Sequence, residues 1–308
     1  MRALRIIFAG SGEFGLPTLR ALQEQHAVVR IFSQPDRPAG RGRKVTPTAV
    51  AQYALDQNLS VTRTANINSE ILEAADVMVV IAFGQKIAEP VVHHARLGSV
   101  NLHASILPRH RGAAPIHAAM LAGETVTGNS IIRLAQKMDA GAVLAQSRLE
   151  IGELETTGEL HDRLAADGAP LMLRTLQNLS NGTLVEQEQD QSQTTLAPKL
   201  SREQTRLDWN EPAAKLARKI LGLYPWPGCR VSLRDARGTP VDRLTLVRAC
   251  PSTTKGAPGR IDSDGLVGAG DGSIVIVEVQ PEGKRPMSLE AYRNGHPWLP
   301  GATLESIL

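Results

Sequence analysis

Residues 4–15, with the sequence LRIIFAGSGEFG, consist of a short apolar run that ends in three glycines. Such a run is typical of a strand buried on both faces and followed by a tight turn. Residues 28–33 and 76–82 are further short runs rich in Ile and Val, and helix-spaced leucines separate the first run from the second. Strand, helix and strand at this spacing predict right-handed crossovers and a parallel sheet.

The rest of the first half continues the α/β alternation. We expect helices over residues 17–25, 46–56, 155–166 and 170–179. A further strand is expected to end at residues 101–103, and two more lie near residues 130–134 and 142–146. These elements predict one α/β layer over residues 1–188.

The second half of the chain differs from the first in its composition and in its pattern of apolar runs. Residues 186–195, EQEQDQSQTT, contain no apolar residue, which indicates a linker or a solvated loop. A helix is expected within residues 205–223. Short runs without helices between them follow and predict a small β-barrel of the OB or SH3 kind: residues 230–233, 243–247, 260–261, 266–267 and 273–279. We therefore divide the chain into a first domain (1–188), a linker (189–204) and a barrel domain (205–308).

Composition excludes several classes of protein. Of the 308 residues, 42% are hydrophobic and 21% are charged, which is typical of a soluble globular chain and not of a disordered one. Two cysteines cannot staple a secreted fold with several disulfides. The apolar runs fall far short of the ~18 residues that a membrane span needs, and the first run breaks into glycines, unlike a signal peptide. We expect a cytoplasmic protein with no membrane contact.

The glycine turn permits one alternative function. Gly10-Ser11-Gly12-Glu13-Phe14-Gly15 matches the G-x-G-x-x-G pattern of dinucleotide-binding turns, and Asp36 follows about twenty residues later. Asp36 lies past the expected end of the second strand, so the pattern does not direct its carboxylate toward a ribose. An NAD(P)-binding turn, a turn for another ligand and a turn needed only for packing all stay open at this point.

Basic residues gather in residues 37–44. Arg37, Arg41, Arg43 and Lys44 stand beside prolines and glycines, with little apolar surface to anchor the segment. An exposed basic loop of this kind is either a solvated surface or a contact for nucleic-acid phosphates. The net charge of +3 points the same way only weakly: residues 205–308 hold 14 Lys and Arg against 11 Asp and Glu, which accounts for all of it.

The segment 101–116, NLHASILPRHRGAAPI, carries the strongest chemical signal. Strand alternation puts Asn101 and His103 on one side, near the carboxyl end of a strand, where open α/β sheets hold their ligands. An amide donor beside an imidazole suits a developing oxyanion, although two polar residues at a strand end can also be a simple cap. Asp139, in the short loop KMDAG, joins them only if the fold brings it there.

A metal site is the other possible role for histidines in this region. His103, His110 and His117 recur every seven residues, but Pro108 and Pro115 break any helix that would align them. Neither cysteine nor a carboxylate joins the group in this segment. The sequence therefore predicts no metal site.

The combined pattern resembles the 10-formyltetrahydrofolate-dependent formyltransferases. It consists of Asn101-x-His103, the following Ser105-Ile106-Leu107-Pro108, and Asp139 thirty-eight residues after the asparagine. Flanking segments extend the resemblance over nearly the whole chain: residues 34–42, 107–116, 197–200, 206–209 and 283–287.

The resemblance implies a Rossmann-like formyltransferase domain, an OB-like C-terminal barrel that binds tRNA, and a role in the initiation of translation. The expected reaction moves a formyl group from 10-formyltetrahydrofolate to the α-amino group of initiator methionyl-tRNA. Folate is then a cosubstrate, and no tightly bound cofactor and no metal are expected. The implied catalytic residues are Asn101, His103 and Asp139. The implied folate-binding residues are Ile81, Ala82, Phe83, Gly84, Ser105, Ile106, Leu107 and Pro108, and the implied tRNA-binding loop holds Arg37, Arg41, Arg43 and Lys44.

Three alternatives remain beside this expectation. The first is a formyltransferase that acts on a small amine, such as glycinamide ribonucleotide or an amino-sugar nucleotide. The second is an NAD(P)-dependent oxidoreductase built on the glycine turn. The third is an RNA-binding module without catalysis, in which Asn101, His103 and Asp139 would tolerate replacement by alanine.

Overall fold

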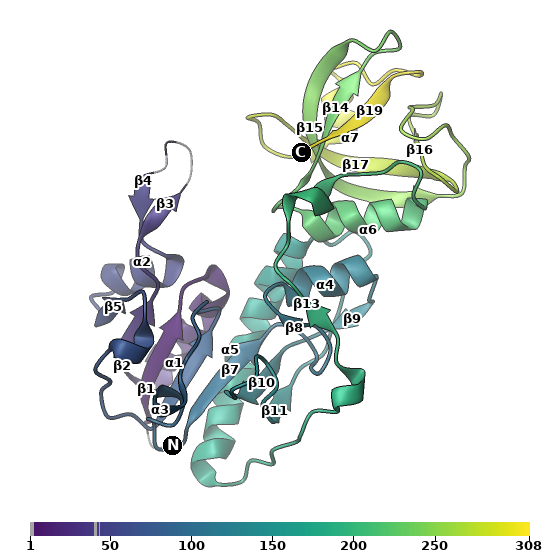
Figure 1. Cartoon of the computed structure of the whole chain (residues 1–308). Coiled ribbons are helices and arrows are strands. Elements are labelled where there is room, and N and C mark those ends of the chain that lie inside the picture. Colours follow the sequence, from purple (N-terminus) through teal and green to yellow (C-terminus); the bar gives the residue numbers. More distant parts are fainter. Residues whose placement is uncertain (1–2, 40–41, 43) are drawn as a thin grey trace. The chain divides into compact units, whose positions relative to one another are not determined.

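The computed structural model describes residues 3–39, 42 and 44–308, and the chain separates into two compact units (Figure 1). We call them the sheet unit and the barrel unit. The sheet unit comprises Met1–Pro115, Val126–Leu149 and His161–Leu196. The barrel unit comprises Ile116–Thr125, Glu150–Leu160 and Ala197–Leu308. The chain therefore crosses between the units more than once before the barrel begins.

The sheet unit is built on a seven-stranded sheet with the order β11-β10-β7-β6-β1-β2-β5. Its strands are β1 (Arg5–Gly10), β2 (Ala27–Ser33), β5 (Val61–Arg63), β6 (Val77–Ile81), β7 (Ser99–His103), β10 (Ser130–Arg133) and β11 (Val143–Gln146). The pairs β1–β2, β1–β6, β2–β5 and β6–β7 are parallel, which confirms the predicted sheet. β10 is antiparallel to both β7 and β11. The short connection between β10 and β11 cannot carry the crossover that a parallel pair needs.

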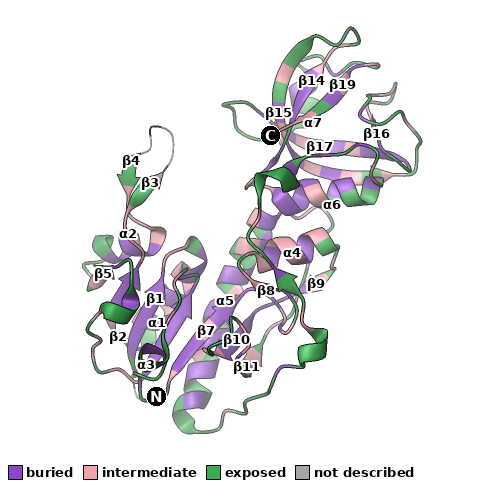
Figure 2. Ribbon diagram, viewed as in Figure 1, coloured by how far each residue is buried: buried purple, intermediate pink, exposed green. Residues whose placement is uncertain are grey.

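Apolar side chains pack on both faces of this sheet. Ile7 and Phe8 on β1 and Met78 on the neighbouring β6 are fully buried, and Figure 2 shows β1 and β7 as largely buried. The helices of the sheet unit are α1 (Leu16–Gln25), α2 (Ala49–Asp56), α3 (Glu89–Val92) and α5 (Thr157–Asn181), of which residues 157–160 are counted with the barrel unit. One-turn 3-10 helices lie at Glu13–Gly15, Ile67–Ser69 and Gln191–Gln193. The core thus fixes the strand ends on which the candidate catalytic residues stand.

Helix α5 differs from the prediction of two helices over residues 155–166 and 170–179. It is one helix of 25 residues with Pro170 inside it. Buried Leu164 and Leu171 lie on either side of the proline, so one apolar face continues through it. Packing along this face outweighs the local tendency of proline to end a helix.

The basic segment forms a hairpin and not an irregular loop. β3 (Arg37–Ala39) and β4 (Lys44–Thr46) pair antiparallel, with Arg37 opposite Thr46, and Figure 1 shows this hairpin extending from the sheet unit. The side chains of Arg37 and Lys44 are exposed. Arg41 and Arg43 lie outside the described residues.

The barrel unit contains a strongly curved antiparallel sheet with the order β16-β17-β15-β14-β19. Its strands are β14 (Cys229–Arg234), β15 (Pro240–Ser252), β16 (Val267–Gly268), β17 (Ser273–Pro281), β18 (Met287–Ser288), which pairs with β17, and β19 (Thr303–Ile307). Single bridges from Arg260 to Thr303 and from Ile261 to Val267 nearly close the barrel, which confirms the predicted fold class. The prediction missed β19 and gave residues 260–261 as a strand where they form only these bridges.

Helices α6 (Ala213–Leu223) and α7 (Leu289–Arg293) belong to the barrel unit, and Leu216, Ile220 and Leu223 of α6 join its core. The remaining elements are β8 (Arg111–Gly112), α4 (Pro115–Ala122), β9 (Val126–Thr127), β12 (Leu149–Glu150), β13 (Leu196–Ala197) and a 3-10 helix at Arg202–Thr205. None of the helices in the described part of the chain is long and apolar enough to cross a membrane.

Candidate active site

Strand β7 carries the first two candidate residues. Asn101 pairs with Val80 on one side and Ile132 on the other, and His103 pairs with Ser130. Because side chains alternate along a strand, Asn101 and His103 lie on one face of the sheet. His103 is buried and Asn101 is half-buried. Among the described residues the Asn101 amide group has no hydrogen-bond partner, so its donors and its acceptor remain available to a substrate.

The two ring nitrogens of His103 have different surroundings. Nε2 lies 2.9 Å from the carbonyl oxygen of His110, and since a carbonyl only accepts, Nε2 carries the proton and donates it there. Nδ1 lies 3.7 Å from Oδ2 of Asp139. That distance is longer than a hydrogen bond, so Nδ1 is the ring atom that can still engage a reacting group.

Asp139 lies in the loop between β10 and β11, with its backbone in the left-handed region (φ 51°). Its Oδ2 atom accepts a hydrogen bond of 2.9 Å from the backbone N–H of Gly112. Gly141 allows the loop to close, because a Cβ atom there would lie 2.0 Å from the carbonyl oxygen of Arg133. The fold therefore does bring Asp139 to His103, which spacing alone left undecided.

Hydrogen bonds from polar side chains hold the loop after β7 in place. Ser105 is fully buried, and its hydroxyl donates to the carbonyl of Arg109 at 2.7 Å. Ser130 donates to the carbonyl of Ser105 at 2.6 Å and accepts from the N–H of Leu107 at 3.0 Å. Gln146 donates to the carbonyl of Leu107 at 2.9 Å. Ser105 and Leu107 are thus held inside the loop, while Ile106 and Pro108 keep partly exposed side chains.

The segment after β6 presents backbone. Ala82 and Gly84 both have positive φ (46° and 76°) and are exposed, whereas Ile81 and Phe83 are buried. The carbonyl of Phe83 accepts from Ser11 Oγ at 3.3 Å and from Gln34 Nε2 at 2.9 Å. The φ of 76° at Gly84 is one that L side chains rarely adopt, so this position favours glycine. The four residues form a fixed ledge with accessible peptide groups at its rim.

The glycine turn is explained by packing. A Cβ atom at Gly10 would lie 2.6 Å from the Phe8 ring and 2.9 Å from the carbonyl of Ile81. Asp36 forms an ion pair of 2.7 Å with Arg63, so its carboxylate is already engaged. The dinucleotide interpretation is therefore not supported by the residues it relied on.

The histidine repeat does not form a metal-binding cluster. His117 directs Nε2 to the carbonyl of Trp226 at 3.1 Å. Across the residues that the structure describes, no group of three or more His, Cys, Asp or Glu side chains converges in a way that could hold a metal ion.

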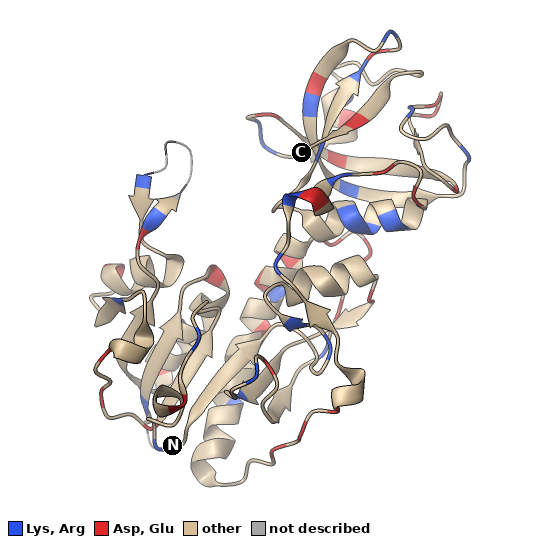
Figure 3. Cartoon of the chain, viewed as in Figure 1, with Lys and Arg blue, Asp and Glu red and all other residues tan. Residues whose placement is uncertain are grey.

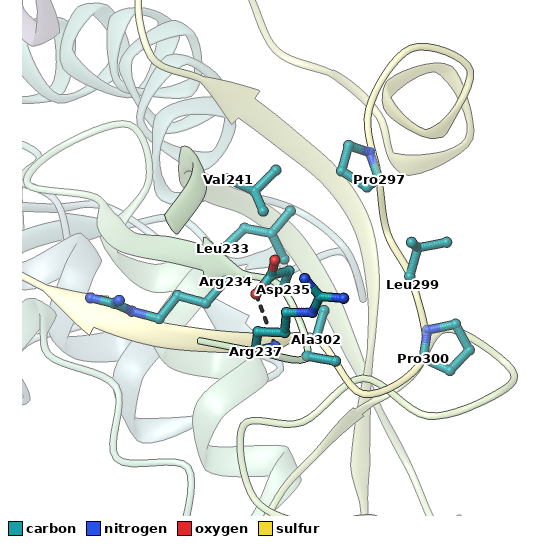
Figure 4. A pocket seen from close by; sticks show the side chains of 10 residues that line it. Leu233, Arg234, Asp235, Arg237, Val241, Pro297, Leu299, Pro300 and Ala302 are labelled. Atoms are coloured by element: carbon teal, nitrogen blue, oxygen red, sulfur yellow. Dashed lines mark hydrogen bonds between the residues drawn. The ribbon is translucent and has the colours of Figure 1, made fainter. Parts of the chain in front are cut away.

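A hollow of about 200 Å³ in the barrel unit lies among Leu233, Val241, Pro297 and Leu299 (Figure 4). It is smaller than the roughly 300–1,000 Å³ of common ligand pockets. Asp235 at its edge accepts from the N–H groups of Arg237 and Thr239 at 2.9 and 2.8 Å, which stabilises a turn. Nothing in this hollow suggests a reaction centre.

Several residues that support the site had no recognisable signal in the sequence. Gln189, inside the expected solvated linker, is buried and bonded to the Asp139 loop and to Arg111. The expectation of solvation is wrong for this residue because its side chain finds partners for all its polar groups. Arg111 and Gly112 do lie in the motif at 101–116, but their contacts across the fold could not be seen there.

Two family models match the chain. The model described as formyl transferase matches residues 1–176, and the model described as formyl transferase, C-terminal domain, matches residues 199–297. The Asn101, His103 and Asp139 side chains belong to the part matched by the first model, and the barrel apart from β19 belongs to the part matched by the second. Fold and site together define a two-domain formyl transferase.

Individual relatives show to which kind of formyl transferase the chain is similar. A methionyl-tRNA formyltransferase from Methylococcus capsulatus is 41% identical over 95% of this chain and 97% of its own length. One from Paracoccus denitrificans is 40% identical over 92% of this chain and 95% of its own. An N-formyltransferase from Helicobacter canadensis, solved with folinic acid and dTDP-3-aminofucose, has a TM-score of 0.67 at 14% identity over 90% and 99% of the two chains, which supports the fold alone. The chain belongs to the family of methionyl-tRNA formyltransferases.

Proposed function

We propose that this protein transfers the formyl group of 10-formyltetrahydrofolate to the α-amino group of initiator methionyl-tRNA. The observation that carries the proposal is the convergence of Asn101, His103 and Asp139 at one strand end in a chain of this family. The protein is a one-carbon transferase of translation, and folate is its cosubstrate. We assign it to the cytoplasm, where its tRNA substrate is used.

The reaction is an acyl transfer in which the neutral amine attacks the formyl carbon. The new C–N bond forms to the α-amino group, the bond to N10 of the folate breaks, and the proton lost by the amine is transferred in net to N10. Charge develops on the formyl oxygen in between. In this proposal the Asn101 amide donates to that oxygen, and so does Nδ1 of His103 when the ring is an imidazolium with a proton on both nitrogens. Each such donor is worth about 2.7–4 kcal/mol.

Asp139 takes the role of proton acceptor and orients His103. Gly112 fixes its Oδ2 atom, and among the described residues Oδ1 accepts no hydrogen bond. The side chain is 15% exposed, so a proton can enter and leave through solvent. No Ser or Cys nucleophile is required in this scheme.

The ledge of Ile81, Ala82, Phe83 and Gly84 is our proposed pterin site, with Ile106 and Pro108 as the opposite wall and Ser105 and Leu107 as its support. Exposed peptide groups with fixed positions suit a flat heterocycle that needs hydrogen bonds along its edge. We keep residues 1–188, 189–204 and 205–308 as the proposed domains, with tRNA contacts from the β3–β4 hairpin and the barrel. Figure 3 shows that α6, which contains Lys215, Arg218 and Lys219, is rich in basic residues.

The test is transfer of labelled formyl from 10-formyltetrahydrofolate to methionyl-tRNA, with the wild type and with Asp139→Asn. We expect transfer that depends on both substrates and falls by about 10²–10⁴ in the variant. Absence of transfer to methionyl-tRNA, with transfer to an amino-sugar nucleotide instead, would overturn the substrate. Equal rates in both proteins would overturn the role of Asp139.

A further inference from the structure

One buried side chain connects the two segments that hold the Asp139 carboxylate. Gln189 is 6% exposed, although it lies in a segment that is otherwise almost entirely exposed. Its Nε2 atom donates to the carbonyls of Asp139 and Gly141, each at 2.8 Å. Its Oε1 atom accepts from Nε and Nη2 of Arg111 at 3.0 and 2.6 Å.

These contacts complete a closed set of hydrogen bonds around Asp139. Arg111 directly precedes Gly112, whose N–H holds Oδ2 of Asp139 at 2.9 Å. Gln189 therefore holds the backbone carbonyls of Asp139 and of Gly141, two residues further on, and it also binds Arg111, the neighbour of the glycine that contacts the Asp139 carboxylate. We propose that Gln189 is a positioning residue that holds Asp139 at His103 for the transfer reaction. This inference rests on the proposed function of Asp139.

The chemistry of the amide explains why glutamine occupies this position. Both hydrogens of Nε2 and the oxygen Oε1 are used, so the side chain needs two donors at one end and an acceptor at the other. A glutamate has nearly the same shape and would keep, or strengthen, the contact with Arg111. Its second carboxylate oxygen would face the carbonyls of Asp139 and Gly141 and, having no proton, could not donate to them. Gln189→Glu therefore removes the hydrogen bonds to the Asp139 loop and keeps the contact with Arg111.

Two further contacts anchor the segment that carries Gln189. Gln187 pairs with Val143 through backbone hydrogen bonds of 2.7 and 2.9 Å, and the Thr195 hydroxyl accepts from the N–H of His110 at 2.8 Å. Because these contacts flank Gln189, its replacement leaves the path of the segment in place. The effect of Gln189→Glu should then be confined to the loop of Asp139.

The experiment measures kcat and both KM values of the full chain with 10-formyltetrahydrofolate and methionyl-tRNA. We expect Gln189→Glu to lower kcat by about tenfold to a hundredfold, since displacement of a catalytic group by about 1 Å has that cost, with both KM values unchanged. Gln193→Glu is the matched control: it adds the same charge to the same segment at an exposed side chain, and we expect wild-type kcat and the same melting temperature.

A double-mutant cycle distinguishes positioning from general support of the fold. If Gln189 acts through Asp139, adding Gln189→Glu to Asp139→Asn should change kcat by less than about twofold. If the double variant loses kcat by the product of the two single reductions, the positioning role is wrong. Wild-type kcat in Gln189→Glu alone would overturn it as well. Wild-type kcat in Asp139→Asn would instead overturn the proposed role of Asp139, and Gln189 with it. If Gln189→Glu does not fold, Gln189→Met, which also lacks the donors, is judged by the same results.

Discussion

Nδ1 of His103 faces Oδ2 of Asp139 across 3.7 Å, while the opposite ring nitrogen donates to the carbonyl of His110 at 2.9 Å. The hydrogen bond of Nε2 therefore holds the ring in place, and Nδ1 is left to contact a substrate. The backbone carbonyl keeps a proton on Nε2, and the carboxylate stands beside Nδ1, which can donate to a substrate when the ring is an imidazolium. This arrangement assigns the proposed oxyanion contact to a single atom of His103.

Asn101→Ala and His103→Ala should each lower kcat by about 10²–10³, because each variant removes one donor to the developing oxyanion. Folate binding should persist, since the ledge at residues 81–84 is unchanged. Steady-state kinetics and a folate titration measure the two effects. Asn178→Ala, at an exposed residue of α5, is the control. Wild-type kcat in either site variant would contradict its oxyanion role.

The β3–β4 hairpin should act on tRNA and not on chemistry. Arg37→Ala and Lys44→Ala should each lower kcat/KM for methionyl-tRNA and make its dependence on salt shallower, by about 0.7–0.9 in log–log slope per lost phosphate contact. The KM for folate should not change. The measurement is kcat/KM over a series of salt concentrations, with Arg174→Ala on α5 as the control. Lines that coincide with the wild type at every salt concentration would show that the hairpin is merely solvated.

Glu159 and Arg248 should make the stability of the protein depend on pH. A hydrogen bond from Arg248 is the main reason that the pKa of Glu159 falls from 4.5 to about 2. Because the folded pKa is depressed, this contribution is fully present above pH 4.5 and is lost as the pH falls toward 2. The Glu159 side chain is half exposed, so we expect less than about 1 kcal/mol.

The comparison is the free energy of unfolding of the wild type and of Glu159→Gln from pH 7 down to pH 2. The variant should be less stable at pH 7, and the two curves should converge near pH 2. Glu282→Gln removes an exposed carboxylate and should follow the wild type throughout. A constant difference between wild type and Glu159→Gln at all pH values would exclude the titration of Glu159 as its cause.

Cys229 should be inert in the folded protein. Burial raises the pKa of its thiol to about 12, so almost no thiolate exists at pH 8. We expect a thiol reagent to modify Cys250, which is partly exposed, and to reach Cys229 only after unfolding. In Cys250→Ser the native protein should then show no rapid labelling. Labelling of that variant at the rate of a free thiol would contradict the burial of Cys229.

The sequence predicted those parts of the site that depend on local geometry. Asn101 and His103 share a face because strand side chains alternate, and this rule needs no information from elsewhere in the chain. The approach of Asp139 depends on how the β10–β11 hairpin closes at Gly141 and on the N–H of Gly112, which lies 27 residues away. Only the family resemblance suggested that contact in advance.

Two errors have a common physical origin. The polar composition of residues 186–195 predicts exposure, yet Gln189 is buried because partners distant in sequence satisfy its amide. Pro170 predicts a break, yet α5 continues because apolar residues on both sides pack along one face. In both cases tertiary contacts outweigh a local preference.

The bridge between Gln187 and Val143 also affects how the sheet unit meets other molecules. β11 is an edge strand of the seven-stranded sheet, and an uncovered edge offers its peptide groups to strands of other chains. The segment that leaves the sheet unit pairs with this strand and so occupies part of that edge. A fragment that ends at residue 176 would contain all three candidate catalytic side chains but would leave β11 unpaired on its outer side. Aggregation through this edge is the behaviour we expect of such a fragment, and extending it through residue 196 restores the cover.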